Sequence, residues 1–270
     1  MHRPWRPNGI VTFASDYGME DNYVAQVKGA MLSRSRTLTI VDVTHSIPPQ
    51  DVWEGAFQLA TAWSSFPPGT VHLAVVDPGV GTERRAVALL ADEHLFVLPD
   101  NGLATLVLAE ARSLAAWMLD RDDLFRHPVS ATFHGRDLFG PVAAALAAGL
   151  APDQVGTPID PAGLQRLPIP AVERTADSVR GPIVSIDRFG NARTLIRRDQ
   201  LPGAPHELVV ECGPLRLAGI RRTFADVAPG EPVAYIGSHG GLEIAVRDRN
   251  AARTWQLHRG MIVEVRQPHR

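Results

Sequence analysis

Short apolar runs alternate with longer amphipathic stretches through the first half of the chain. The runs end in turn residues, whereas the stretches between them repeat apolar residues at helical spacing. This alternation is typical of β-α units on a mainly parallel sheet. The pattern predicts strands at 9–15, 38–45 and 71–77, a hairpin at 86–100, and helices at 21–34, 51–66, 101–111 and 137–150.

The hydrophobic pattern changes after residue 155. Segment 156–178 is rich in proline and has no clear period, so it predicts a linker. Beyond it, short alternating runs are separated by Gly, Pro and Asn, as in a small β-barrel or sandwich. We therefore predict an α/β N-terminal domain over 8–155 and a smaller all-β, barrel-like C-terminal domain over 179–268.

Composition narrows the choice of partners. The chain has 270 residues, 45% of them hydrophobic, and its 27 Lys and Arg nearly balance 29 Asp and Glu. This balance predicts a globular protein with no nucleic-acid or membrane partner. A single cysteine excludes an internal disulfide framework and a Cys-rich zinc site. Without an apolar leader or a long apolar run, we expect a cytoplasmic protein.

The stretch "VVDPGVGTERR" places Asp77 at the end of a predicted strand, with Arg84 close enough in sequence to fold back towards it. An ion pair alone would explain the two residues. A catalytic interpretation needs a third group, and the loop "TFHGRDLFGP" offers His134 and Asp137. A carboxylate, an arginine and a histidine that converge on one water could orient it and share its proton.

Asp16 follows the first predicted strand and precedes a glycine turn. At the carboxyl end of a parallel strand, a carboxylate can accept hydrogen bonds from a vicinal diol such as a ribose, or it can cap a turn. Asp42 and His45 end the second strand and could be metal ligands or could secure the turn. Without a matching ligand pattern elsewhere, the structural interpretation is favoured and no metal is predicted.

The C-terminal half contributes two further polar turns. "SIDRFGNARTL" supplies Asp187, Phe189 and Asn191, and "YIGSHGGLEIAV" supplies Ser238 and Glu243. An aromatic face and an amide suit a purine, and a carboxylate suits an ammonium group. Two ordinary hairpin turns would use the same residue types.

The chain resembles the family of S-adenosylmethionine hydroxide adenosyltransferases, which also includes the halogenating enzymes fluorinase and chlorinase. The resemblance runs from about Thr12 to about Val265. It rests on these motifs, in this order: "SDYGMEDNYV", "DVTHSIPPQDVWEGA", "FPPGTVHLAVVDPGVGTERR", "PDNGL", "TFHGRD", "IDRFGN" and "GSHGGLEIA".

The resemblance implies a reaction and an assembly. Water, activated as hydroxide, attacks ribose C5′ of S-adenosylmethionine and expels methionine, leaving adenosine. No metal or other cofactor is required, because sulfonium is already a good leaving group and the enzyme need only align the nucleophile. The family also implies a homotrimer whose sites lie between the N-domain of one subunit and the C-domain of the next.

The resemblance also implies residue roles. Asp77, Arg84 and His134 match the family's catalytic set. The substrate-binding matches are Asp16 for the ribose, Asp21 and Asp187 for the methionine end and its ammonium group, Asn191 for the adenine edge and Ser238 for the methionine carboxylate.

This sequence departs from the family pattern at three places. "SDYG" stands where "TDFG" is usual, "RTLI" replaces "TNI", and His239 follows Ser238. Three functions are alternatives to S-adenosylmethionine hydrolysis: a halogenase, a sensor that binds adenosine or S-adenosylmethionine without turnover, and a metal-dependent nucleotide hydrolase. The halogenating relatives lack equivalents of Asp77 and His134, and a carboxylate repels a halide, so both residues favour water as the nucleophile.

Overall fold

The computed structural model describes residues 5–268, and the chain divides into two compact units between Pro168 and Ile169. This point lies within the segment predicted as a linker. Two short strands lie in that segment. β7 (Pro158–Ile159) pairs in the sheet of the first unit, and β8 (Glu173–Arg174) pairs in that of the second.

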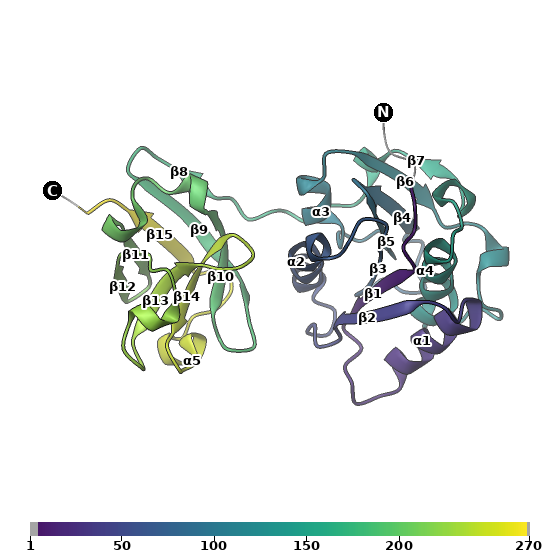
Figure 1. Cartoon of the computed structure of the whole chain (residues 1–270), viewed down its shortest axis with the longest axis horizontal. Coiled ribbons are helices and arrows are strands. Elements are labelled where there is room, and N and C mark those ends of the chain that lie inside the picture. Colours follow the sequence, from purple (N-terminus) through teal and green to yellow (C-terminus); the bar gives the residue numbers. More distant parts are fainter. Residues whose placement is uncertain (1–4, 269–270) are drawn as a thin grey trace. The chain divides into compact units, whose positions relative to one another are not determined.

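A seven-stranded sheet forms the centre of the first unit, in the order β2-β1-β3-β5-β4-β6-β7 (Figure 1). Strands β2, β1, β3 and β5 pair in parallel, whereas the pairings of β4, β6 and β7 are antiparallel. The strands are β1 (Ile10–Ser15), β2 (Thr39–Thr44), β3 (Val71–Val75), β4 (Ala86–Ala91), β5 (His94–Pro99) and β6 (Leu114–Met118).

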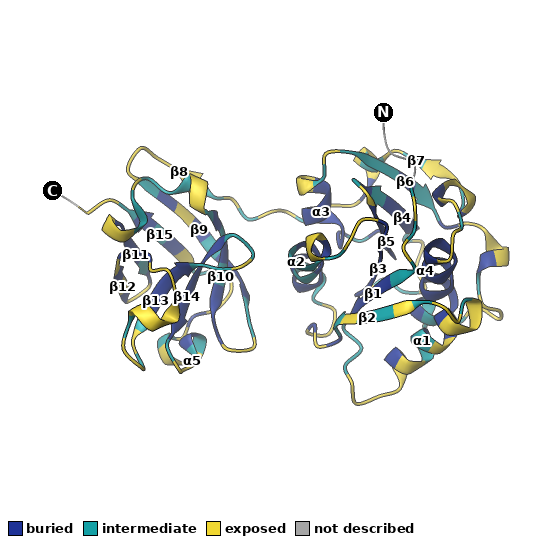
Figure 2. Ribbon diagram, in the orientation of Figure 1, coloured by how far each residue is buried: buried dark blue, intermediate teal, exposed yellow. Residues whose placement is uncertain are grey.

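Helices cover both faces of this sheet: α1 (Tyr23–Arg34), α2 (Val52–Ala62), α3 (Thr105–Glu110) and α4 (Gly140–Ala147). Successive strand residues point to opposite faces. Leu73 of β3 therefore packs in the cluster that includes α1 and α4, and Ala74 packs in the cluster that includes α2 and α3. Figure 2 shows the buried strands between these layers. The predicted α/β class and the hairpin at 86–100 are confirmed.

The helices of the first unit differ from prediction at their ends. Residues 101–104 form a turn, in which the Asn101 side chain donates to the Val76 carbonyl at 2.8 Å, so α3 is shorter than predicted. The predicted helix at 137–150 begins as a π-helical segment, Gly135–Phe139, which leads into α4. Strand β6 was not predicted. Within residues 5–268, no helix combines the length and apolar character needed to span a bilayer.

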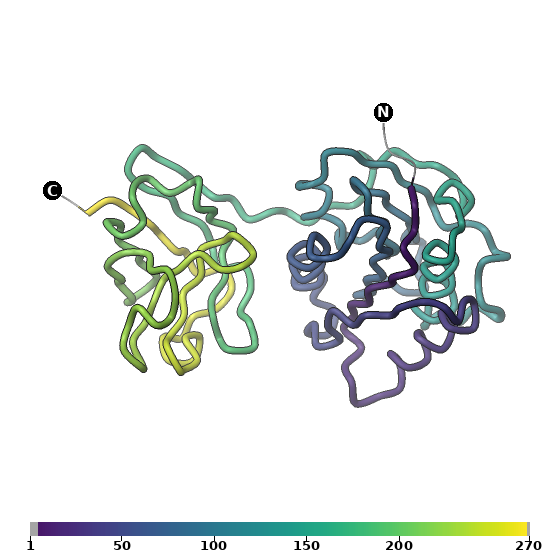
Figure 3. The backbone as a smooth tube through the Cα atoms, in the orientation of Figure 1, coloured from purple at the N-terminus to yellow at the C-terminus, as the bar shows by residue number. Residues whose placement is uncertain are grey.

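The second unit is an antiparallel, barrel-like sheet, as predicted, in the order β12-β11-β15-β9-β10-β14-β13 with β8 beside β9. A bridge between Arg221 and Tyr235 and a hydrogen bond from the Arg221 amide to the Ala234 carbonyl connect the region after β12 to β13, so the sheet is nearly closed. Figure 3 follows this winding of the backbone. The elements are β9 (Ser178–Ile186), β10 (Ala192–Arg197), β11 (Val209–Cys212), β12 (Leu215–Ala218), β13 (Pro232–Ile236), β14 (Gly241–Val246), α5 (Ala251–Trp255) and β15 (Ile262–Arg266).

Candidate functional site

The parallel pairing of β1 with β3 brings two sequence-predicted carboxylates to one edge of the sheet. Ser15, the last residue of β1, lies opposite Val75, the last residue of β3. Asp16 follows Ser15 directly, Asp77 follows Val75 after one further residue, and both line the same pocket. The carboxyl ends of parallel strands are where open α/β sheets place ligands.

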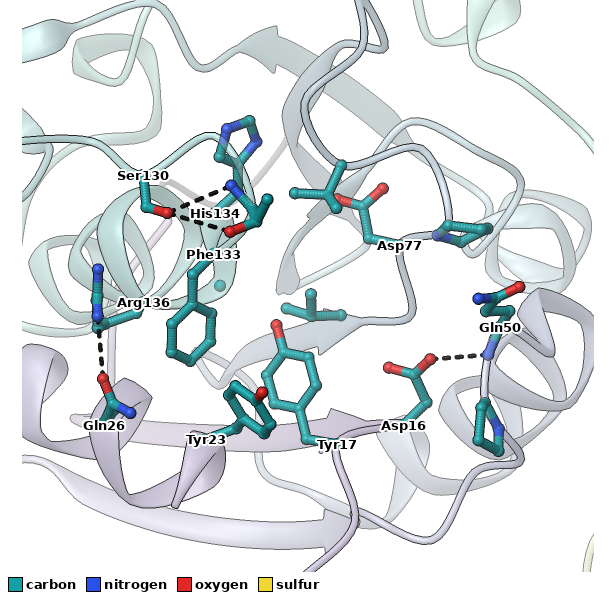
Figure 4. Close-up of a pocket in the computed structure, with 16 residues that line it drawn as sticks. Asp16, Tyr17, Tyr23, Gln26, Gln50, Asp77, Ser130, Phe133, His134 and Arg136 are labelled. Atoms are coloured by element: carbon teal, nitrogen blue, oxygen red, sulfur yellow. Dashed lines mark hydrogen bonds between the residues drawn. The ribbon is translucent and has the colours of Figure 1, made fainter. Parts of the chain in front are cut away.

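The pocket has a volume of about 700 Å³, within the range of sites that hold small organic ligands. The loop before α4 and the start of α1 complete its wall (Figure 4). Its lining residues are Asp16, Tyr17, Tyr23, Gln26, Pro49, Gln50, Val75, Asp77, Pro78, Val80, Ser130, Thr132, Phe133, His134, Gly135 and Arg136.

Asp77, Arg84 and His134 form a continuous hydrogen-bonded chain. Arg84 Nε donates to both Asp77 carboxylate oxygens at 2.9 and 3.0 Å, and Arg84 Nη2 donates to Oδ2 at 2.5 Å. The same Nη2 lies 2.7 Å from His134 Nδ1. The side chains of Asp77 and Arg84 are only 6% and 10% exposed, so this ion pair is largely shielded from water. The structure thus joins the three predicted residues.

The charge state of His134 follows from this contact. Arg84 can only donate, so Nδ1 of His134 must accept, and the neutral ring carries its hydrogen on Nε2. Burial, and then the adjacent Arg84 cation, lower the pKa of His134 below its ordinary value. His134 is therefore neutral at physiological pH. Arg84 also stacks over Phe139, 5.1 Å from the ring centre, and this contact further restricts its guanidinium.

The paired arginines of the motif diverge. Arg85 leaves the pocket and binds Asp100 of the "PDNGL" motif, with Nε 2.8 Å from Oδ2. The turn between Asp77 and Arg84 thus points one guanidinium back to Asp77 and the next one towards β5.

Asp137 is completely buried and organises the loop that carries His134. Its carboxylate accepts from Arg136 Nε and Nη2 at 2.7 and 2.8 Å, from Arg126 Nη1 at 2.9 Å, and from the Ser130 amide at 3.0 Å. Burial alone would raise the pKa of Asp137, but these hydrogen bonds outweigh it and lower the pKa to about 2. The sequence placed Asp137 beside His134; the structure shows that it holds the loop.

Asp16 is anchored and still open to the pocket. One carboxylate oxygen accepts from the Gln50 amide at 2.8 Å (Figure 4). A carboxylate has about four acceptor positions, so capacity remains for a ligand. Asp21, predicted to act in the same loop, is exposed and does not line the pocket.

Asp42 and His45 stabilise the segment that presents Asp16. Ser15 Oγ lies 2.7 Å from His45 Nδ1, and His45 Nε2 lies 3.1 Å from Asp42 Oδ1. Lys28 Nζ binds Asp42 at 2.6 Å. These contacts are the structural role that the sequence favoured for the pair. Among the described residues, no three His, Cys, Asp or Glu side chains are grouped so that they could hold a metal ion.

The candidates of the second unit lie in two turns. Asp187 holds its own hairpin, because its oxygens accept from the amides of Phe189 and Asn191 at 2.9 and 2.8 Å and from Asn191 Nδ2 at 2.9 Å. Ser238 lies in the β13–β14 turn. There, His239 Nδ1 lies 3.0 Å from a carboxylate oxygen of buried Glu243.

Sequence reasoning missed the aromatic wall of the pocket. Tyr17 packs edge-to-face with Phe133 at 5.8 Å, and both rings contact Tyr23. The available signal was their position: Tyr17 directly follows Asp16, and Phe133 directly precedes His134.

Comparisons with known proteins cover nearly the whole chain. Residues 11–156 match the SAM hydroxide adenosyltransferase N-terminal domain, and residues 181–264 match the corresponding C-terminal domain. The chain is 43% identical to the (R)-S-adenosyl-L-methionine hydrolase of Salinispora tropica, over 91% of this chain and 93% of that protein.

The chain is also similar, at lower identity, to a fluorinase and to a protein of known crystal structure. The fluorinase of Actinopolyspora mzabensis is 32% identical over 95% of this chain and 96% of that protein. A crystal structure of an uncharacterized conserved protein from Thermotoga maritima superposes with a TM-score of 0.89 at 32% identity, covering 95% of this chain and all of that one.

Proposed function

Since the chain belongs to the SAM hydroxide adenosyltransferase family, we propose that it hydrolyses S-adenosyl-L-methionine to adenosine and L-methionine. One observation carries the proposal: the Asp77 carboxylate lines the pocket, and Arg84 donates hydrogen bonds both to its two oxygens and to His134 Nδ1. An anionic acceptor held rigidly at the end of β3 suits a neutral water better than an anionic halide.

The proposed step is a displacement at C5′ of the ribose. The water oxygen forms a bond to C5′ as the bond from C5′ to the sulfonium sulfur breaks, and the sulfur keeps the electron pair as methionine leaves. The water proton passes to Asp77 or to solvent. An aspartate is a weak base for water, so alignment and electrostatics supply most of the acceleration. The Arg84 cation holds the Asp77 carboxylate in its orientation, and the neutral His134 ring in turn holds Arg84.

Substrate contacts are proposed from the same motifs. Asp16 binds the ribose hydroxyls with its remaining acceptor positions, and Asp21 contacts the methionine end. Asp187 binds the methionine ammonium group and Asn191 the adenine edge. Both of these already hydrogen-bond within their hairpin, so the hairpin presents them in a fixed orientation. Ser238 binds the methionine carboxylate.

The family resemblance also supports a cytoplasmic homotrimer, with each site formed by the N-domain of one subunit and the C-domain of the next, and with no metal or further cofactor. Light scattering of the purified protein tests the trimer directly: a mass near three times 29.3 kDa is expected, and a monomeric mass would contradict it.

A halogenase is the second candidate because of the similarity to fluorinase. The two functions separate in one assay, in which the protein is incubated with S-adenosyl-L-methionine, with and without chloride or fluoride and with and without EDTA, and the products are separated by chromatography. We expect adenosine and methionine in every case. A halide-dependent 5′-halo-5′-deoxyadenosine would favour the halogenase, and sensitivity to EDTA would favour a metal-dependent hydrolase. Tight binding without products would favour a sensor.

A further inference from the structure

Tyr17 brings a hydroxyl group to the wall of the pocket that carries Asp77 and His134. The aromatic ring is fixed by edge-to-face contacts with Phe13 at 6.3 Å and Phe133 at 5.8 Å. The hydroxyl lies against the backbone of Gly135, since a Cβ added there would be only 2.2 Å from Tyr17 Oη. The residue next to Gly135 is His134. In Figure 4 the Tyr17 hydroxyl points into the pocket between the segments that carry His134 and Asp77.

Among residues 5–268, this hydroxyl makes no hydrogen bond to another side chain or to the backbone, and because Tyr17 is only partly buried the group stays open to the pocket that it lines. The phenol of Tyr17 also stays protonated and can therefore donate a hydrogen bond. Burial raises the pKa of Tyr17 above its ordinary value, and the carboxylates of Asp16 and Asp77 raise it further. The group therefore keeps its proton throughout the physiological pH range and offers it to whatever occupies the pocket.

We propose that Tyr17 is a further catalytic residue, whose hydroxyl donates a hydrogen bond to the oxygen of the attacking water while Asp77 accepts a hydrogen from that water. This inference rests on the proposed hydrolysis. A water has two lone pairs, and a donor that occupies one leaves the other free to attack C5′. Tyr17 keeps its own proton: the C5′–O bond forms, the C5′–S bond breaks with its electrons moving to sulfur, and the released proton leaves through Asp77 or solvent.

Tyr17→Phe keeps the ring and its contacts and leaves no protein group without its partner. The variant should therefore fold, and its loss of activity should be partial. We expect kcat to fall about tenfold, the effect of one well-placed hydrogen bond, with KM and the Kd for adenosine changed by less than about twofold.

Tyr23→Phe is the matched comparison, because it removes the same group from a neighbouring ring at the more exposed rim. Its fall in kcat should be at least about fivefold smaller than that of Tyr17→Phe. The profile of kcat against pH should also keep its shape in Tyr17→Phe, because a donor that never titrates contributes no limb to the profile.

Three outcomes would overturn the inference: an unchanged kcat in Tyr17→Phe, a rise in KM at constant kcat, which would assign Tyr17 to substrate binding, or the loss in Tyr17→Phe of a rise in kcat at high pH, which would make the Tyr17 phenolate a base. The wild-type protein separates this inference from the proposed function. If it releases adenosine and methionine while Tyr17→Phe is equally fast, only the role of Tyr17 fails. If the wild type releases neither product, the hydrolysis and the inference fail together.

Discussion

At the scale of single residues, the carboxylate of Asp77 combines a structural and a proposed chemical role. It neutralises Arg84, which is 10% exposed, and it faces the pocket. The sequence could predict this pair, because only a turn separates the two residues. It offered His134, which lies 50 positions beyond Arg84, only as one candidate for the third group, and the family motif is what singled it out. Spacing carries no information about contacts made by a distant loop.

Asp77→Asn separates the two roles. The amide keeps the shape but loses the charge, so the buried Arg84 loses its counter-ion and the free energy of unfolding should fall by about 1–3 kcal/mol. We expect kcat for S-adenosyl-L-methionine to fall by at least about a hundredfold, since the water loses its anionic acceptor. Urea unfolding and product chromatography measure the two effects.

Asp122→Asn is the control for Asp77→Asn, because it makes the same chemical change at a side chain that is 81% exposed, where no buried charge loses its partner. It should leave both quantities unchanged. A folded Asp77→Asn protein that kept wild-type kcat would show that Asp77 serves only as the partner of Arg84.

At the scale of elements, the sequence predicted β1, β3, β4 and β5 because each is a short apolar run that is almost entirely buried. It failed where a local pattern is short or where tertiary contacts decide. β6 is a five-residue strand that begins only three residues after α3, and the first residues of the predicted helix 101–111 are held in a turn by Asn101. The π-helical segment before α4 gave no periodic signal, because the wider turn spans only Gly135–Phe139.

Asp137 determines the conformation of that π-helical segment and its loop. In Asp137→Asn, the amide cannot accept from Arg136, Arg126 and Ser130 together, and the two cations lose a shared anion. We expect the free energy of unfolding to fall by about 2 kcal/mol, less than for a fully buried pair because Arg126 is half exposed. Because His134 depends on this loop, kcat should fall as well.

Urea denaturation of Asp137→Asn beside Asp123→Asn provides the comparison. Asp123 also pairs with an arginine, but its side chain is 63% exposed, so its loss should have no measurable effect on stability. Equal stability of the two variants would mean that the loop is held by its backbone alone.

At the scale of the whole molecule, both the predicted α/β sheet and the predicted barrel-like sheet are present. The near closure of the barrel-like sheet, however, depends on residues far apart in the chain. The bridge between Arg221 and Tyr235 joins segments whose own patterns predict only ordinary strands and turns. Likewise, the buried polar groups of the first unit follow from packing rather than from pattern. His72 and His94 sit in strands β3 and β5 as if they were apolar residues, and both are almost completely buried.

These histidines make the stability of the fold depend on pH. His72 lies 2.8 Å from Thr12 Oγ1 and 3.1 Å from His94, and it stacks on Phe96 at 4.8 Å. Burial, and then the neighbouring His94, lower the pKa of His72 to about 3. Below pH 6.5, the ordinary pKa of histidine, His72 therefore binds a proton in the unfolded chain but stays neutral in the folded chain. Above that value the titration of His72 has no effect on stability, and as the pH falls from 6.5 towards 3 it destabilises the folded state increasingly.

We therefore expect His72 alone to lower the free energy of unfolding by about 2 kcal/mol between pH 6.5 and pH 4.5. Asp137, with a pKa of about 2, titrates below this window and does not contribute to it. His72→Phe keeps an aromatic ring against Phe96 but cannot titrate. It should be less stable at pH 7, where Thr12 and His94 lose a partner, yet its stability should fall less steeply with acid. Urea unfolding at several pH values gives both slopes, and parallel slopes would show that the acid sensitivity arises elsewhere in the molecule.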